Sequence, residues 1–145
     1  HYELNAAPTA ACKEFRRIEA NVFSYLNNEC AAGRWYDLII CDPPAFAKSR
    51  AHLSEALRGY TNLNKSCFAL LREGGVLVTS SCSGMVSGEA FRDCLRLAAG
   101  LAKRQVRVLE YCSQAVDHTD LLAFPEGRYL KTIILEVNGT VSSSL

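Results

Sequence analysis

Apolar residues follow two different spacings along the chain, and each spacing predicts one kind of element. Apolar positions three or four residues apart predict helices, over residues 22–32, 53–71 and 88–101. Short apolar runs between turn residues predict strands over residues 35–41, 76–80, 106–112 and 129–137, and residues 15–20 can form a further short strand. Asn21 and Ser87 stand directly before two of the helices, where a side-chain oxygen can cap the first turn.

The order of the predicted elements defines the fold class. Strands and helices alternate up to the strand at 106–112, which is typical of an α/β protein with a mostly parallel sheet. The second half of segment 35–41 is apolar without alternation, so we expect this strand to be covered on both faces. The last two strands have no helix between them, and we expect them to pair as an antiparallel hairpin at one edge.

Polar or reactive residues directly follow three of the predicted strands. They are Asn21, the tripeptide Asp42-Pro43-Pro44, and Cys82 within segment 81–84. In open α/β sheets, ligands bind outside the carboxyl ends of the strands. We therefore expect these features to converge on one rim of the sheet, which is stronger evidence for a site than any one of them alone.

Asp42-Pro43-Pro44 has a functional and a structural interpretation. The prolines fix the backbone and leave carbonyl groups without local donors, and a carboxylate beside them can bind the edge of a base. The structural alternative is a stiff turn with a capping aspartate. The position after an apolar strand favours a site.

Cys82 also has two interpretations. Serines and a glycine flank it after a buried strand, so we expect an accessible, reactive thiol. The alternative interpretation is that Cys82 is a small buried apolar residue, as most free cysteines are. We expect burial for four other cysteines, Cys30, Cys67, Cys94 and Cys112. Cys41, the last residue of a strand, fits either interpretation.

Three weaker features leave both interpretations open. Asn21 can accept a hydrogen bond from an exocyclic amine, or simply cap the following helix. The sequence Arg58-Gly59-Tyr60 places a cation beside an aromatic ring, for stacking and phosphate contact or as a solvated helix face. Asp117-His118 is either an acid–base pair or an incidental loop sequence.

Composition narrows the class of protein without naming a partner. The chain has 145 residues, is 49% hydrophobic and has a net charge of +1, which fits one soluble domain and neither requires nor excludes a nucleic acid. Its seven cysteines show no C-x-x-C pair, which indicates free thiols, a cytoplasmic location and no zinc site. No apolar run approaches the roughly 20 residues that span a bilayer, so we expect no membrane partner.

Residues 36–46, which read YDLIICDPPAF, resemble motif IV of the class I AdoMet-dependent methyltransferases. With the other motifs, the chain resembles the RlmI family, bacterial 23S rRNA methyltransferases that form 5-methylcytosine. The match runs from about residue 21 to residue 137. The further matching pieces, in order, are Arg58-Gly59-Tyr60 with Asn64, Glu73-Gly74-Gly75, segment 81–84, Asp117-His118 and segment 125–131.

The resemblance implies a Rossmann-like sheet whose first strands are missing, AdoMet as cofactor, and ribosomal RNA of the large subunit as substrate. Cys82 would attack the cytosine ring as a thiolate, and Asp42 would hydrogen-bond the base. The implied cofactor-binding residues are Asn21, Val22, Asp42 and Pro43. The implied substrate-binding residues are Pro44, Phe46, Arg58 and Tyr60.

Two departures from related patterns bear on this interpretation. Many RNA 5-methylcytosine enzymes carry a second cysteine where this chain has Ala45; the RlmI family also lacks it, which leaves the proton acceptor unassigned. No G-x-G-x-G loop is present. We expect that loop and an RNA-binding PUA domain upstream of His1. Residues 1–137 would then be the C-terminal part of a catalytic domain, inactive alone, and residues 138–145 a mobile tail.

Competing interpretations remain open at this stage, as does the oligomeric state, a homodimer included. An amino-group methyltransferase also uses D/N-P-P, but with an aromatic residue directly after the prolines, where this chain has Ala45. A non-catalytic RNA-binding or scaffold domain would keep the sheet and lose the cofactor loop. A thiol hydrolase would need His118 to approach Cys82.

Overall fold

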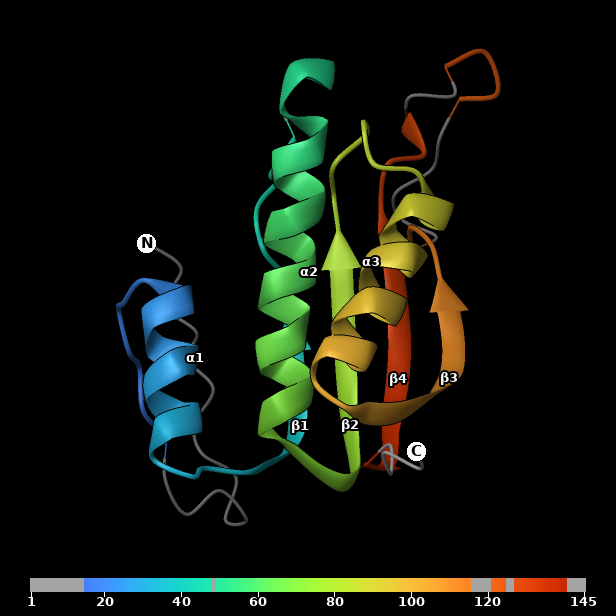
Figure 1. Ribbon diagram of the computed structural model, residues 1–145. Coiled ribbons are helices and arrows are strands. Elements are labelled where there is room, and N and C mark those ends of the chain that lie inside the picture. Colours follow the sequence, from blue (N-terminus) through green and yellow to red (C-terminus); the bar gives the residue numbers. More distant parts are fainter. Residues whose placement is uncertain (1–14, 48, 116–120, 125–126, 141–145) are drawn as a thin grey trace.

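The computed structural model describes residues 15–47, 49–115, 121–124 and 127–140 (Figure 1). In this part of the chain, helices pack on a four-stranded sheet of order β1-β2-β4-β3. The elements, in chain order, are α1 (Val22–Ala31), β1 (Tyr36–Cys41), the 3-10 turn η1 (Arg50–His52), α2 (Leu53–Leu70), β2 (Leu71–Ser81), α3 (Gly88–Leu101), β3 (Arg104–Cys112) and β4 (Lys131–Thr140).

The sheet topology confirms the predicted fold class. β1 and β2 pair in parallel, whereas β4 pairs antiparallel with both β2 and β3. Strands β1, β2 and β3 therefore run in the same direction and only β4 is reversed, which confirms the antiparallel C-terminal pair. Figure 1 shows that the loops following β1, β2 and β3 leave the sheet at the same end.

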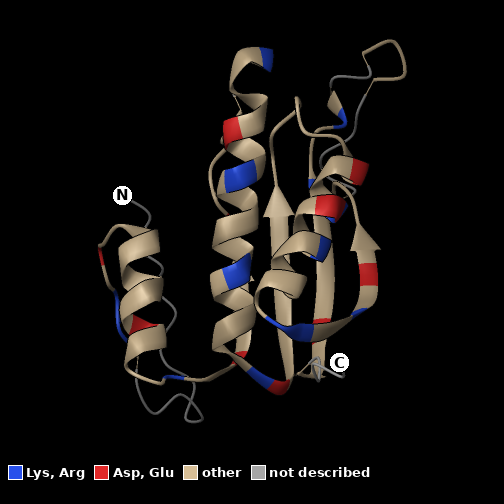
Figure 2. Ribbon diagram, in the orientation of Figure 1, with Lys and Arg blue, Asp and Glu red and all other residues tan. Residues whose placement is uncertain are grey.

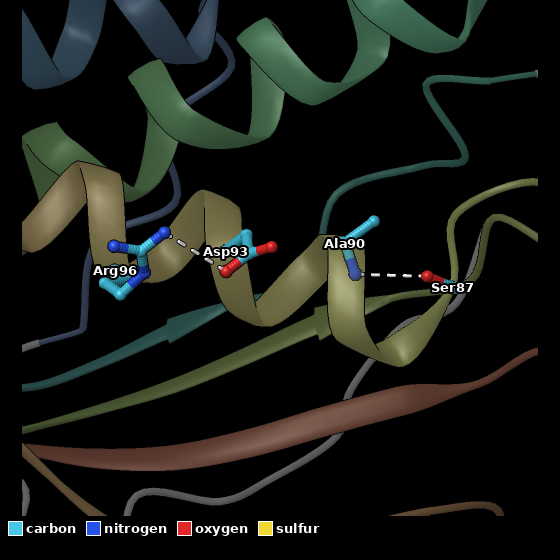
Figure 3. Close-up of polar contacts among 4 residues, drawn as sticks. All are labelled: Ser87, Ala90, Asp93 and Arg96. Carbon is cyan, nitrogen blue, oxygen red and sulfur yellow. Dashed lines mark hydrogen bonds and ion pairs between the residues drawn. The ribbon is translucent and has the colours of Figure 1, made fainter.

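The caps of two helices form as predicted. Asn21 Oδ1 accepts hydrogen bonds from the backbone N–H groups of Phe23 and Ser24, at 3.1 and 3.2 Å. Ser87 Oγ accepts from the N–H of Ala90 at 3.1 Å, as Figure 3 shows. These bonds satisfy amide groups that a helix start otherwise leaves unpaired. The Asp93–Arg96 pair further along α3, also in Figure 3, is exposed and adds little stability.

The core lies between the sheet and helices α2 and α3, which cover one face of it (Figure 1). Its largest fully buried side chains include Tyr60, Phe68, Phe91 and Leu77. In the described part of the chain, none of the helices is both long and apolar enough to cross a membrane.

Strand β2 begins five residues earlier than predicted, because Glu73-Gly74-Gly75 is a bulge within the strand and not a separate turn. The pairing passes from Tyr36↔Leu71 to Leu38↔Val76, so β2 carries extra residues there. Gly74 has a φ of 75°, and a Cβ on Gly75 would lie 2.8 Å from the carbonyl oxygen of Arg72. Both positions therefore require glycine.

The predicted strand over residues 15–20 is wrong. These residues form no regular element, and Phe15 and Ile18 are exposed. A strand needs a neighbour to satisfy its backbone, and within the described residues no strand lies beside this segment. The local sequence allowed a short strand, but the pairing that would form it is absent among the described residues.

Two further expectations about strands need correction. Strand β1 is not covered on both faces: Leu38 is 53% and Ile40 69% exposed, because the helices of the described chain cover only the opposite face. Strand β4 extends through Thr140, so residues 138–140 belong to the sheet and not to a mobile tail. Residues 141–145 lie outside the described part.

Replacing Leu77 by alanine tests this assignment of the core. The side chain is fully buried on an inner strand, so we expect the free energy of unfolding to fall by about 2–5 kcal/mol, from lost transfer energy and a residual cavity. Leu97→Ala on α3 is the control, because Leu97 is 57% exposed and should cost about 0.5 kcal/mol or less. Urea denaturation measures the two values, and equal losses would contradict the assignment.

Candidate active site

A cleft of about 440 Å³ lies at the carboxyl ends of β1 and β2. Asp42, Pro43, Pro44 and Cys82 line one part of it, as the sequence predicts for neighbouring strand ends. The segments that follow β3 and precede β4 line the rest, through Gln114, Ala115, Tyr129 and Leu130. The structure therefore brings the thiol and the carboxylate to the same cavity.

Parallel pairing of β1 and β2 explains why the two groups meet. Cys41 lies opposite Thr79, so Asp42 and Cys82 both follow closely where the two strands end. The Cys82 thiol is 3.9 Å from the carbonyl oxygen of Pro43, a distance at which sulfur makes a weak hydrogen bond. The thiol is partly buried and borders the cleft, which agrees with the accessible thiol expected from the sequence.

Two serines on either side of Cys82 fix the direction of its side chain. Ser81 and Ser83 are both buried against α2, at 0% and 1% exposure. Side chains of an extended chain alternate between opposite faces. Because its neighbours point inward, Cys82 points outward, toward the cleft.

The hydroxyl group of Tyr60 holds these serines in place. It accepts a hydrogen bond from Ser81 Oγ at 3.0 Å and donates to Ser83 Oγ at 3.4 Å. Ser83 Oγ also accepts from the backbone N–H of Ala47, at 3.2 Å. The same network therefore joins helix α2, the loop after Asp42 and the loop that carries Cys82.

Tyr60 cannot contact RNA in this structure, so its predicted role in substrate binding needs correction. Its side chain is fully buried, with its ring 4.7 Å from that of Phe46 and 5.4 Å from that of Phe91. The sequence Arg58-Gly59-Tyr60 lies on α2, and a helix turns Arg58 outward when Tyr60 faces the core. Tyr60 acts on the site through the serines.

Phe46 and Arg58 meet at a second cavity of about 430 Å³, next to the loop that follows Asp42. Phe23, His52, Glu55 and Asn62 also line it. Gly59 permits this packing, because a Cβ there would lie 3.2 Å from the Phe46 ring. The structure thus unites an aromatic ring and an exposed cation that the sequence had placed in separate motifs.

Asn21 and Val22 lie at the exposed start of α1 and do not line the cleft at Cys82. The side-chain oxygen of Asn21 is engaged in capping, which favours the structural interpretation of that residue. Asp117-His118 and Pro125-Glu126 lie outside the described residues. Charges of both signs are interspersed over the helices and strands in Figure 2, in keeping with the net charge of +1.

The other described cysteines differ from Cys82 in their surroundings. Cys67 and Cys94 are buried as predicted, and burial raises the pKa of the Cys94 thiol. A hydrogen bond with Cys41 is the main cause that raises the pKa of the Cys67 thiol, and burial raises it further. Cys112 is only partly buried, and Cys30 is exposed on α1, so the expectation of burial is wrong for Cys30. Cys41 is buried.

One residue at this rim was not singled out from the sequence. Lys131, the first residue of β4, donates hydrogen bonds to the carbonyl oxygens of Ser83 and Val86, both at 2.6 Å. It stood in the sequence only as the last residue of segment 125–131. The last strand was predicted to run opposite to its neighbours, so its first residue was expected at the rim. A lysine at that position is the signal that could have identified it.

Comparison with solved structures shows which proteins share this fold. A chain from Streptococcus mutans, named provisionally as a SAM-dependent methyltransferase, has a TM-score of 0.67 at 23% identity, over 81% of this chain and 30% of that chain. A second structure, provisionally named a methyltransferase and complexed with SAH, has a TM-score of 0.68 at 24% identity over the same shares. The fold is that of the SAM-dependent methyltransferases.

Comparison with curated proteins finds relatives of similar sequence. The chain is 42% identical over 119 residues to ribosomal RNA large subunit methyltransferase I of Shewanella frigidimarina, and 43% identical over 118 residues to the protein of that name in Aeromonas salmonicida. The matches cover 82% and 81% of this chain but 30% of each relative. No family model matches the chain. By sequence, the chain is therefore similar to one segment of ribosomal RNA large subunit methyltransferase I, and it spans about 30% of the length of the curated relatives it matches.

Tyr60→Phe tests the network under Cys82. Removing the hydroxyl leaves two buried serine hydroxyls without this partner, so we expect a loss of about 1–3 kcal/mol in the free energy of unfolding. Tyr111→Phe is the matched control, because Tyr111 is 59% exposed and should change it by about 0.5 kcal/mol or less. Denaturant titration measures the free energy of unfolding of both variants. Equal values for the two would refute a structural role for the Tyr60 hydroxyl group.

Proposed function

We propose that this chain carries the catalytic cleft of an AdoMet-dependent methyltransferase that forms 5-methylcytosine in large-subunit ribosomal RNA through a covalent adduct on Cys82. One observation carries the proposal: an outward-pointing thiol and a carboxylate face the same cleft, at the ends of adjacent parallel strands. The names of the curated relatives and the fold of the solved structures support it.

Cys82 performs the covalent step. Its thiolate sulfur bonds to C6 of cytosine, which makes C5 of the ring nucleophilic. AdoMet, when bound, supplies the methyl group that C5 receives, and S-adenosylhomocysteine is the product of that transfer. A base then removes the proton from C5 and the bond between C6 and sulfur breaks, which releases Cys82. The base is not assigned to a residue.

Asp42 recognises the ring. Cytosine presents its exocyclic amino group as a donor, and a carboxylate accepts from such a group. Asp42 lines the cleft beside Cys82 and is exposed to it, so its oxygen atoms are available to the substrate. This contact selects cytosine, and it stabilises the protonated form of the ring in the adduct.

The residues proposed for AdoMet come from the end of β1 and the start of α1. Asp42 and Pro43 line the cleft and fit a cofactor whose methyl group must reach the ring there. Asn21 and Val22 belong to the neighbouring start of α1, where the side-chain amide NH₂ of Asn21 is available besides the capping oxygen. Asn21 stands where the family resemblance implies a contact with the adenine of AdoMet.

The residues proposed for RNA are Pro44, Phe46 and Arg58. Phe46 can stack on an unpaired base and Arg58 can contact a phosphate, the usual means by which proteins bind single-stranded RNA. Their shared cavity adjoins the loop that carries Asp42, so it lies on the path of nucleotides flanking the target. The thiol in the main cleft counts against amino-group methylation, which needs no such nucleophile.

Cys82→Ala in the full-length natural protein is the direct test. Without the sulfur no adduct forms, so we expect methylation to fall to background and covalent trapping on 5-fluorocytosine RNA to disappear. Cys30→Ala, which removes an exposed thiol on α1, should leave both intact. Radiolabelled methyl transfer and denaturing gels measure the two quantities, and normal activity of the Cys82 variant would refute the mechanism.

Asp42→Asn tests the carboxylate. The amide keeps the size of the side chain but loses the negative charge, and we expect turnover to fall by about 10²–10⁴-fold, the range for a group that assists proton movement. Asp37→Asn is the matched control, since Asp37 lies on the same strand, is exposed and pairs with Arg72 away from the cleft. Near-normal kcat for the Asp42 variant would remove its proposed role.

A further inference from the structure

Lys131 stabilises the turn that follows Cys82 through hydrogen bonds. Its ammonium group donates to the carbonyl oxygens of Ser83 and Val86, both at 2.6 Å, and thereby connects β4 to the loop between β2 and α3. The turn is closed internally by a hydrogen bond from the N–H of Val86 to the carbonyl of Ser83, at 3.2 Å. The contacts reach across 48 residues of chain to the residue next to the thiol.

The charge of Lys131 is not neutralised by a carboxylate. Among the described residues, no acidic oxygen lies within ion-pair distance of its ammonium group, although the side chain is partly buried. Burial lowers the pKa of Lys131, and a negative charge on Cys82 opposes that effect. The ammonium group therefore lies near enough to Cys82 for the two charges to interact, and it is bonded to the carbonyl group of the next residue, Ser83.

Other ionisable groups face this pair from neighbouring elements. Asp42, on the loop after β1, and Tyr129, which precedes β4, share the cleft with Cys82. A neighbouring cavity of about 350 Å³ borders Lys131 from α3 and β3, through Glu89, Arg92, Tyr111 and Cys112. Since Asp42 disfavours a second negative charge in the cleft, a cation beside the thiol offsets that repulsion.

We propose that Lys131 is a positioning residue for the nucleophile: its ammonium group fixes the turn after Cys82 and supplies the positive charge that favours the Cys82 thiolate. This inference rests on the proposed function, in which Cys82 attacks the ring. Cys82 loses its proton to solvent before the attack, and the positive charge of Lys131 is retained throughout. Lys131 itself touches neither substrate nor cofactor.

The test measures the reactivity of Cys82 against pH, in the full-length natural protein and without RNA. Iodoacetamide alkylation is followed by mass spectrometry of the peptide that contains Cys82. Lys131→Gln keeps a donor for a carbonyl group but removes the charge, so we expect the midpoint of the alkylation profile to rise by about one pH unit. Lys131→Arg restores the charge and should return the midpoint to its wild-type value.

Lys65→Met is the matched control, because Lys65 is exposed on α2, and its midpoint should be unchanged. If Lys131→Gln does not fold, the Asp42→Asn protein, which lacks the competing carboxylate, decides the question: raising the salt from about 0.05 to 1 M shortens the screening length and should raise its midpoint. A folded Gln variant with the wild-type midpoint overturns the proposal. So does a salt-independent midpoint of the Asp42→Asn protein if the Gln variant fails to fold.

The alkylation profile separates this inference from the proposed function. Alkylation requires neither RNA nor methyl transfer, so it reports only on the thiol. If Lys131→Gln leaves the midpoint unchanged and the wild-type protein is trapped normally on fluorocytosine RNA, only the proposed role of Lys131 is refuted. If the midpoint rises in Lys131→Gln but the wild-type protein is not trapped on fluorocytosine RNA, the covalent methyltransferase mechanism is refuted and the effect of Lys131 on Cys82 stands.

Discussion

The buried hydroxyl group of Tyr60 is the contact on which the geometry of the cleft depends. A polar group without access to water must be hydrogen-bonded, and the partners of this one are the two serines that flank Cys82. If either serine moved outward, the hydroxyl would lose a partner and the alternation that directs the thiol would be broken. Satisfying one buried oxygen atom therefore determines where a sulfur atom lies.

The features that could be predicted from the sequence are local, or follow from simple topology. The caps at Asn21 and Ser87 depend on residues within one turn of helix. The meeting of Asp42 and Cys82 needed only the expectation that two neighbouring strands run parallel and end at one rim. Both predictions succeed because few alternative arrangements satisfy the same pattern.

The features that could not be predicted depend on contacts distant in sequence. The segment 15–20 has strand-like composition but no strand beside it in the described chain, and the apolar residues of β1 do not reveal which faces are covered. The tripeptide Arg-Gly-Tyr alone does not specify that Tyr60 is buried and Arg58 exposed, although the apolar spacing of Leu57, Tyr60 and Leu63 along the helix does. Lys131 finds its acceptors 45 and 48 residues away.

The reversal of β4 has a consequence beyond the pairing of strands. Because β4 runs opposite to its neighbours, its first residue, and not its last, lies at the rim where β1 and β2 end. A slip of two residues along β2 would leave the same side chains facing the core, yet it would carry the ammonium group about 7 Å from the turn. If Lys131 acts as proposed, strand register also sets the reactivity of the Cys82 sulfur, and a register-shifted variant with an intact core loses that reactivity.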